Sequence, residues 1–80
     1  MAVAVQLSIY PLGQEHLSPA INRALAIFGQ YGLSVTPGTM SSVISGEDGA
    51  VFGALKEVYQ ALAGQGGLVM VATFSNACPV

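Results

Sequence analysis

The sequence predicts an α+β sandwich in which a four-stranded antiparallel sheet carries two helices on one face. Two longer stretches repeat apolar residues every three or four positions, as amphipathic helices do. Four shorter stretches alternate or are continuously apolar, as strands are, and Gly or Pro residues separate many of these segments. With only 80 residues, the chain is expected to form one domain over residues 1–80.

The first strand is expected to run from Val3 to Pro11, where proline has no N–H for the ladder and ends the strand. One row of alternate side chains is apolar: Val3, Val5, Leu7 and Ile9. The other row is polar or small and carries no charge: Ala4, Gln6, Ser8 and Tyr10. Because half-exposed strands usually carry charged residues on their outer row, we expect this row to face a ligand or a partner subunit.

The first helix is expected to begin at Ser18–Pro19, since a serine hydroxyl can cap an orphan N–H and proline has none to lose. It continues to Gln30 or Tyr31, and Gly32 fits the left-handed position that closes a helix. Its core-facing stripe recurs at i, i+4 and i+7: Ile21, Leu25 and Phe28, with Ala24 beside them.

Two short strands are expected next. The second strand covers Leu33 to Thr36, and Pro37–Gly38 breaks it or forms a hairpin corner. The third strand covers Thr39 to Ser45 and carries four hydroxyl groups, on Thr39, Ser41, Ser42 and Ser45. These hydroxyls fit solvent exposure on an edge hairpin as well as they fit contact with a ligand.

The second helix is expected to start with Asp48 as its N-cap and to end at the glycines of residues 64–67. Its apolar stripe has helical spacing: Val51, Leu55, Val58 and Leu62. Phe52 and Tyr59 lie beside this stripe and are expected to widen the buried face. The last strand, Leu68 to Ser75, is apolar on both faces as far as Thr73, which predicts a strand buried on both sides.

The resulting order, β-α-β-β-α-β, is that of the ferredoxin-like plan. In that plan the first strand lies between the third and the last, and both helices cover one face of the sheet. The apolar row of the first strand is therefore expected to meet the helices. Gln6, Ser8 and Tyr10 are expected on the open face.

The composition predicts an oligomer. Hydrophobic residues make up 52% of the chain and charged residues 8%, so a monomer would expose much uncharged surface. We expect a homodimer or homotetramer. Arg23 and Lys56 are the only strong bases and the net charge is −2, which argues against a nucleic-acid partner.

The sequence also predicts a cytoplasmic protein that does not insert into membranes. No apolar run approaches the ~18 residues that cross a bilayer, and no basic residue precedes the apolar N-terminal stretch as in a signal peptide. The single cysteine, Cys78, cannot form an internal disulfide and is compatible with a reducing compartment.

Catalysis is not expected. His16 is the only histidine and has no orienting partner in the sequence, and Cys78 has no nearby cation to lower its pKa. An RNA-binding sheet would need exposed aromatic and basic residues, a metal-transfer domain a Cys-x-x-Cys loop, and an acylphosphatase-like site an arginine cradle. The chain offers none of these patterns, and we expect no metal site.

Three segments resemble the YkoF-related family of proteins that bind thiamine or its hydroxymethylpyrimidine precursor. Residues 6–12, Gln-Leu-Ser-Ile-Tyr-Pro-Leu, are similar to the Gln-x-Ser-x-Tyr-Pro opening of that family. Residues 40–46 with Val51–Phe52 resemble its central segments, and residues 69–75 with Cys78–Pro79 its closing ones. The type member carries two such repeats and this chain carries one, so a partner subunit is expected to supply the second.

This resemblance implies a ligand with an aminopyrimidine ring, which both donates and accepts hydrogen bonds and has apolar faces. Uncharged side chains can match its polar groups: Gln6, Ser8, Ser41, Ser42, Thr73 and Asn76. Flat or polarizable side chains can pack on its faces: Tyr10, Met40, Met70 and Phe74. Glu47 or Asp48 would attract the cationic thiazolium ring of thiamine.

Two functional hypotheses follow. In the first, the protein is a non-catalytic carrier or sensor of thiamine or hydroxymethylpyrimidine and needs no cofactor. In the second, it is a structural or regulatory assembly module that binds no small molecule, and the open sheet face is a protein interface.

Overall fold

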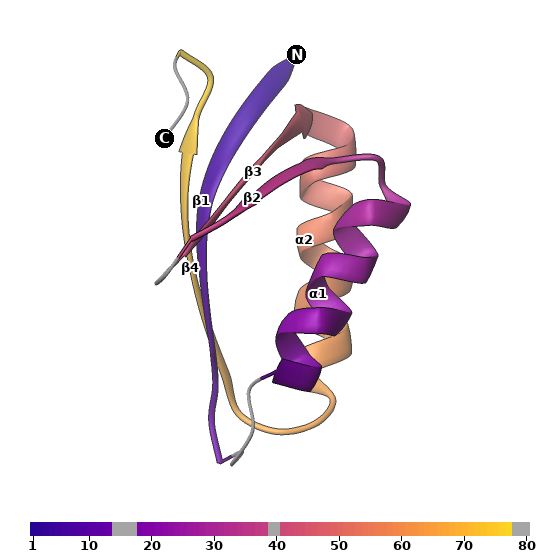
Figure 1. Ribbon diagram of the computed structural model, residues 1–80, viewed down its shortest axis with the longest axis vertical. Helices are drawn as coiled ribbons and strands as arrows, with labels where there is room; N and C mark the ends of the chain where they lie inside the picture. Colours follow the sequence, from indigo (N-terminus) through magenta and orange to yellow (C-terminus); the bar gives the residue numbers. More distant parts are fainter. Residues whose placement is uncertain (14–17, 39–40, 78–80) are drawn as a thin grey trace.

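A computed structural model describes residues 1–13, 18–38 and 41–77. The predicted βαββαβ order and fold class are confirmed, with a four-stranded antiparallel sheet and two helices on one of its faces (Figure 1). The elements are β1 Ala2–Pro11, α1 Ser18–Gln30, β2 Ser34–Pro37, β3 Ser42–Glu47, α2 Asp48–Ala63 and β4 Leu68–Ser75.

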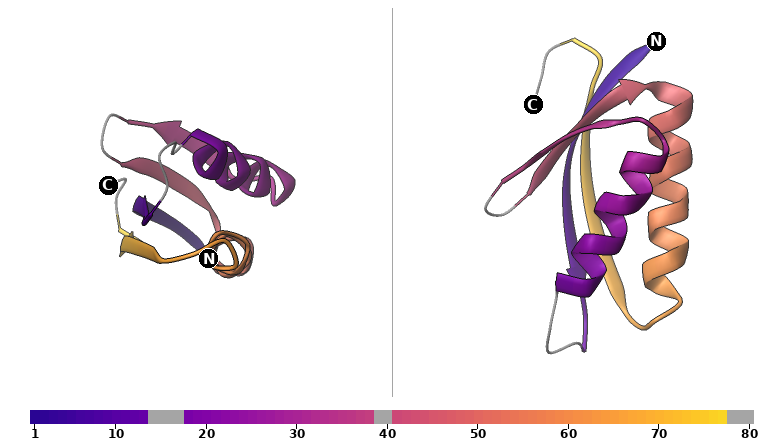
Figure 2. Two further views of the ribbon diagram at one scale, coloured as in Figure 1. Left: turned by 90° about the horizontal axis from the view of Figure 1, so that it is seen from below. Right: turned by 45° about the vertical axis from the view of Figure 1, so that its right-hand side comes forward.

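The strand order is β2-β3-β1-β4, so β1 is central as predicted and β2 and β4 form the edges. The pairing of β1 with β3 extends from Ala2–Glu47 to Leu7–Ser42. The pairing with β4 extends from Ala4–Ser75 to Pro11–Leu68. Residues 8–11 of β1 therefore continue past the end of β3 with β4 alone beside them, and Figure 2 shows β1 and β4 reaching beyond the β2–β3 hairpin.

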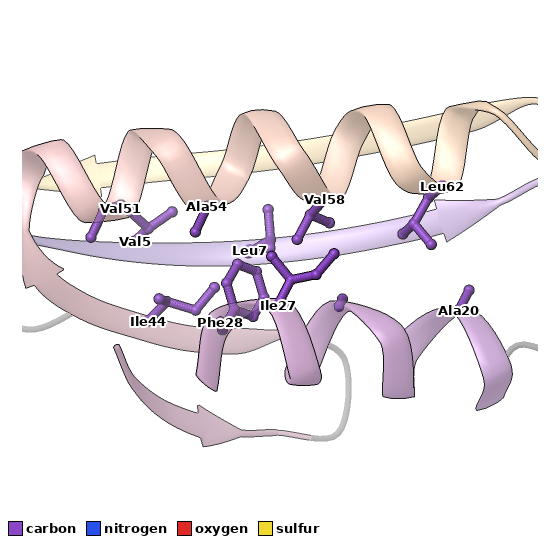
Figure 3. Close-up of a cluster of buried hydrophobic side chains, with 11 residues drawn as sticks. Val5, Leu7, Ala20, Ile27, Phe28, Ile44, Val51, Ala54, Val58 and Leu62 are labelled. Atoms are coloured by element: carbon purple, nitrogen blue, oxygen red, sulfur yellow. The ribbon is translucent and has the colours of Figure 1, made fainter. Parts of the chain in front are cut away.

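The core lies between the sheet and the two helices, as predicted from the alternation of β1 (Figure 3). Val5 and Leu7 of β1 are buried against Ile44 of β3 and Phe28 of α1. Each large side chain buried in this way contributes about 1.5–3 kcal/mol of transfer free energy. The other buried residues are Ala20, Ala24, Ile27, Val51, Ala54, Val58 and Leu62. Gln6 and Tyr10 point to the opposite face and are exposed.

The start of α2 differs from the prediction by one residue. Glu47, with φ −66° and ψ 143°, is the N-cap, and Asp48 is the first helical residue. The Asp48 carboxylate accepts the N–H of Gly49 at 2.9 Å, while its own N–H donates to the Met1 carbonyl at 2.8 Å. Predicting Asp48 as the cap was wrong because the main chain of Met1 takes the role of the cap. Both carboxylates still lie where the helix dipole favours negative charge.

The hairpin strands also shift relative to the prediction. β2 includes Pro37, which an edge strand tolerates because its outward N–H needs no partner. β3 begins at Ser42 rather than at Thr39, and it continues to Glu47 because Gly46 and Glu47 pair with Val3 and Ala2. Thr39 lies outside the described residues, and Ser41 precedes the strand.

The prediction that β4 is buried on both sides is wrong for the single chain. β4 is an edge strand, and Val69, Val71 and Phe74 are 45%, 54% and 45% exposed. Only Leu68 and Met70 pack against the core from this strand. The apolar composition of β4 therefore reflects something other than burial within one chain.

A contact between the helices fixes the end of α1. The Tyr31 hydroxyl donates a hydrogen bond to Oε1 of Glu57 at 3.0 Å, and this bond raises the pKa of Tyr31 above its ordinary value. The Tyr31 ring lies 3.2 Å from where a Cβ on Gly53 would be, so the missing side chain of Gly53 makes room for the ring. Among the described helices, neither is long and apolar enough to cross a membrane.

Candidate functional site

A cavity lies beside the part of β1 that β3 does not cover. Its volume is about 340 Å³, within the ~300–1,000 Å³ typical of small-ligand sites. Its lining residues come from the second half of β1, from α1, and from the β2–β3 hairpin. The lining residues are Leu7, Ser8, Ile9, Ile21, Ala24, Leu25, Phe28, Pro37, Gly38, Ser41 and Ser42.

The apolar walls of the cavity come from the same helical stripe that fills the core. Phe28, at the inner end, is 1% exposed, whereas Ile21, two turns earlier, is 36% exposed. This gradient arises because the register of β3 ends at Ser42, so the first turns of α1 have no third strand beneath them. Ile21 and Leu25, predicted as core residues, thus form a wall of the cavity, while Phe28 at the other end of the stripe belongs to the core.

Three serine residues border the cavity. Ser42 pairs with Leu7 and so directs its hydroxyl to the helix side, whereas Ser8 alternates with Leu7 and lies on the open-face row. Ser8 comes from β1, Ser42 from the first residue of β3, and Ser41 from the residue before it. Nε2 of Gln6 donates a hydrogen bond to Oγ of Ser41 at 3.3 Å. Because a hydroxyl that accepts one hydrogen bond still has its own hydrogen to give, this contact orients Ser41 as a donor. The cavity therefore has serine residues at its edge and an apolar wall on the α1 side.

The structure separates the other predicted ligand contacts. Tyr10 and Thr73 lie on the open face of the sheet, since Tyr10 is outward in β1 and Thr73 pairs with Gln6. Met70 and Phe74 pair with Ile9 and Val5 and so lie on the helix side. The Phe74 ring stacks on Phe52 of α2, with centroids 5.1 Å apart and planes at 18°.

Asn76 lines a second, shallower hollow of about 370 Å³ at the opposite end of β1. This hollow contains Ser45, Ser75 and Thr36 but little apolar wall beyond small side chains. Met40, the remaining predicted contact, lies outside the described residues, as do His16 and Cys78. Of the predicted set, Ser8, Ser41 and Ser42 border the cavity, and Gln6 is joined to Ser41 by its hydrogen bond.

The sequence analysis missed the contributions of Ile21, Leu25 and Pro37 to the site. Helical periodicity marked Ile21 and Leu25 as core residues, and periodicity cannot tell a core from a cavity wall. A usable signal was present in the segment lengths. When the first strand is longer than the third strand beside it, its last residues have a neighbouring strand on one edge only.

The charged side chains that the structure describes lie away from the cavity. No charged residue is among the described residues that line it. Arg23 is exposed on the side of α1 opposite Ile21 and Leu25, and Lys56 is exposed on α2. Glu47 and Asp48, expected to attract a cationic ring, lie at the far end of β1. They contact the Met1 amino group at 2.8 and 3.6 Å, and the Glu47 hydrogen bond raises the pKa of that group above its ordinary value.

The described residues contain no cluster of three or more His, Cys, Asp or Glu side chains that could hold a metal ion. Among the described residues that line the cavity there are hydroxyl groups and hydrocarbon, and no acid, base or thiol. Such an arrangement can bind a small neutral ring and orient it through hydrogen bonds.

Comparisons with solved structures show the same fold in several proteins. A hypothetical protein from a Methanocaldococcus species matches with a TM-score of 0.86 and 24% identity, over 96% of this chain and 81% of its own. A Thermotoga maritima protein, named for thiamine biosynthesis or salvage, matches with a TM-score of 0.80 and 19% identity, over 94% and 83%. A domain of unknown function from Bacillus cereus matches with a TM-score of 0.79 and 18% identity, over 100% and 82%.

A search of curated proteins found no significant match. The family model described as the YKOF-related family matches residues 2–80, which include both helices, all four strands and every described residue that lines the cavity. The chain therefore belongs to the YkoF-related family.

Proposed function

We propose that this protein binds thiamine or its hydroxymethylpyrimidine precursor in the cavity between α1 and β1, without transforming it. The observation that carries this proposal is a space of about 340 Å³ that Ser8, Ser41 and Ser42 border and whose wall on the α1 side is apolar. Membership of the YkoF-related family and the name of the Thermotoga relative both support a thiamine-related role.

The chemistry of the ligand fits this lining. An aminopyrimidine has ring nitrogens that accept hydrogen bonds and an exocyclic amine that donates them. Serine hydroxyls can do both, so each can adapt to the ring edge that it meets. The methyl group and the flat faces of the ring would pack on Ile21, Leu25 and Ile9. Sites of this kind are mostly apolar with a few placed polar groups.

Binding without chemistry follows from the same residues. The described lining lacks a group that titrates near neutral pH and therefore lacks a general acid or base. A carrier or sensor needs only a reversible site, which hydroxyls and hydrocarbon supply. The proposed protein thus holds the vitamin or its precursor and releases it unchanged.

The test is calorimetric titration of thiamine and hydroxymethylpyrimidine into the parent protein and two variants. Ser42→Ala removes a hydroxyl that lines the cavity, whereas Ser45→Ala removes one from the same strand that points to the open face. We expect Ser42→Ala to lower the affinity about five- to a hundred-fold, as loss of a buried hydrogen-bond partner does. Ser45→Ala should leave it unchanged.

An assembly module without a small ligand is the second candidate, favoured by the exposed apolar residues of β4. The same titration separates the two candidates. If folded parent protein produces no heat with either compound at millimolar concentration, the binding proposal is wrong and the assembly role becomes the better explanation. Equal losses in Ser42→Ala and Ser45→Ala would place the ligand elsewhere.

A further inference from the structure

The main-chain hydrogen-bonding groups of β1 alternate between its two neighbouring strands. In an antiparallel pair, every second pair of opposed residues is hydrogen-bonded, and each residue of such a pair turns both its N–H and its C=O toward the other strand. The Asp48 N–H donates to the Met1 carbonyl at 2.8 Å, one step beyond the register of β1 with β3. The Leu12 N–H donates to the Gly67 carbonyl at 2.9 Å, one step beyond the register with β4. The main chain of odd-numbered residues in β1 therefore faces β3, and that of even-numbered residues faces β4.

Ile9 is the first residue of β1 whose main chain faces the β3 side beyond the end of the register. That register stops at the pair Leu7–Ser42. β4 continues beside β1 as far as Pro11, but on the other edge. No described residue forms a main-chain hydrogen bond with the N–H or C=O of Ile9 on the β3 side. The described part of β1 thus presents one donor and one acceptor, side by side, at this edge.

The cavity lies in the place that a longer β3 would occupy. Three consecutive residues of β1, Leu7, Ser8 and Ile9, line it, although neighbouring side chains of a strand point to opposite faces. A cavity that touches both rows of side chains lies at the edge of the strand, where the main chain is accessible. Ser41 and Ser42 line it from the hairpin, which diverges from β1 and β4 in the right-hand view of Figure 2.

We propose that the main chain of Ile9 binds the aminopyrimidine edge of the ligand, with its N–H donating to a ring nitrogen and its C=O accepting from the exocyclic amine. This inference rests on the proposed function and names the groups that give the site its specificity. In the ligand, the amine is next to a ring nitrogen, so one edge offers a donor beside an acceptor. The ring thereby takes the place of a third strand. Its other nitrogen and its hydroxymethyl group are left for the serine hydroxyls of the hairpin.

The length of the free edge favours a small ring over a peptide strand. Peptides that add to a sheet pair through several alternating main-chain groups. Beyond Leu7, Ile9 supplies the last N–H of β1 on this edge, because the next residue with the same orientation is Pro11. One donor–acceptor pair suits an aminopyrimidine edge and is too little for a strand. Ile21 and Leu25 line the same space with hydrocarbon that can cover the ring.

A fixed main-chain pair discriminates between rings in a way that hydroxyl groups cannot. A serine hydroxyl rotates to donate or accept, whereas a main-chain N–H only donates and a C=O only accepts. In the analogue that carries an oxo group in place of the amine, the adjacent ring nitrogen carries a hydrogen, so donor and acceptor exchange places. We expect this analogue to bind at least about tenfold more weakly than hydroxymethylpyrimidine, since both groups of Ile9 would lose their partners. Equal affinities in calorimetric titration overturn the proposal.

The direct test is heteronuclear NMR of the parent protein with and without saturating hydroxymethylpyrimidine. The amides of Ser8 and Tyr10 face β4 and should exchange slowly with solvent in both states. The Ile9 amide should exchange quickly in the free protein, and at least about tenfold more slowly when the ligand is bound, with a downfield shift of its resonance. An Ile9 amide that is already as protected as its two neighbours in the free protein overturns the proposal.

The same titration distinguishes failure of this inference from failure of the proposed function. Heat of binding with shifts at Ile21 and Ser42, but with an unchanged Ile9 amide, would show that the ligand enters the cavity and is held by other groups. That result overturns the inference and leaves the proposed function standing. No heat and no shifts at millimolar ligand overturn both.

Chemical synthesis of the chain provides a matched pair of variants. An ester oxygen in place of the Ile9 N–H removes the proposed donor and keeps every side chain, whereas the same replacement at Ser8 removes an N–H that faces β4. We expect the Ile9 ester to bind hydroxymethylpyrimidine about five- to a hundred-fold more weakly, as loss of a buried hydrogen bond does. The Ser8 ester should have the lower melting temperature of the two and nearly the affinity of the parent. Parental affinity in the Ile9 ester overturns the proposal.

Discussion

Leu7 and Ser8 are adjacent in β1 and have opposite environments. Leu7 is 3% exposed, packs against the helices and also lines the inner part of the cavity, while Ser8 lies on the other row of the strand, at the cavity edge where β3 ends. Because strand side chains alternate, neighbouring residues can serve stability and binding separately. A pair of substitutions at these two positions therefore tests the assignment of both.

Ser8→Ala should weaken ligand binding while leaving the fold intact, because alanine fits the strand and the core row is untouched. The expected loss is roughly 1–3 kcal/mol, or about five- to a hundred-fold in affinity. Leu7→Ala should instead lower the free energy of unfolding by about 2–5 kcal/mol through the cavity it opens. Thermal melting and calorimetric titration of both variants check this. Early melting of Ser8→Ala with a stable Leu7→Ala would mean that the faces are inverted.

At the scale of elements, Gly29 and Gly32 near the C-terminal end of α1 differ in backbone conformation. Gly32 follows the helix with φ of 69°, a left-handed conformation that L-residues adopt at a cost. Gly29 lies inside α1 with helical geometry, and a Cβ at either position would meet no atom within 4 Å. Space is therefore equal at the two positions, and only the backbone conformation distinguishes them.

Gly32→Ala should lower the free energy of unfolding by about 1–2 kcal/mol, the cost of a left-handed L-residue. Gly29→Ala should raise it by about 0.5–1 kcal/mol, because alanine is the better helix former. Denaturant unfolding of both variants measures the two changes. Similar shifts in the same direction would show that the conformation of Gly32 does not control the end of α1.

The elements themselves were largely predictable from the sequence, since strand alternation and helical spacing are local properties of the chain. The row of Val5 and Leu7 and the span of β4 are confirmed. Features that depend on contacts between distant segments could not be predicted in the same way. The end of β3 is set by its register with β1, and the cap of α2 by the distant Met1 carbonyl. The cavity exists because β3 ends before β1 does. Ser8 and Ser42 were predicted from their hydrogen-bonding side chains, whereas Ile21 was missed because its contribution depends on where β3 ends.

At the scale of the whole molecule, the scarcity of positive charge predicts which form of the ligand binds. Arg23 and Lys56 are the only strong bases in the sequence, and both side chains lie away from the cavity. A phosphate group in an uncharged, partly apolar site loses hydration without gaining a counter-charge. The site should therefore prefer unphosphorylated compounds.

We expect hydroxymethylpyrimidine phosphate to bind at least about tenfold more weakly than hydroxymethylpyrimidine, a difference of about 1.4 kcal/mol. Ile21→Arg, which adds a cation at the mouth of the cavity, should narrow this difference, and Arg23→Ala on the opposite side of α1 should not change it. Competition titrations with both compounds on the three proteins measure the ratio. Tighter binding of the phosphate ester by the parent would contradict the charge argument.

Because Ile21 is partly exposed, a substitution there can change ligand specificity without much effect on the stability of the fold. Most of the side chains that hold the molecule together lie deeper, around Val5, Phe28 and Val58, whereas Ile21 is at the rim of the cavity. A new side chain there can reshape the site with little effect on the packed interior. Since the chain contains no tryptophan, an indole at this position would be its sole strong fluorophore. A tryptophan at position 21 could thus adapt the cavity to other flat heterocycles and signal their binding through a change in its fluorescence.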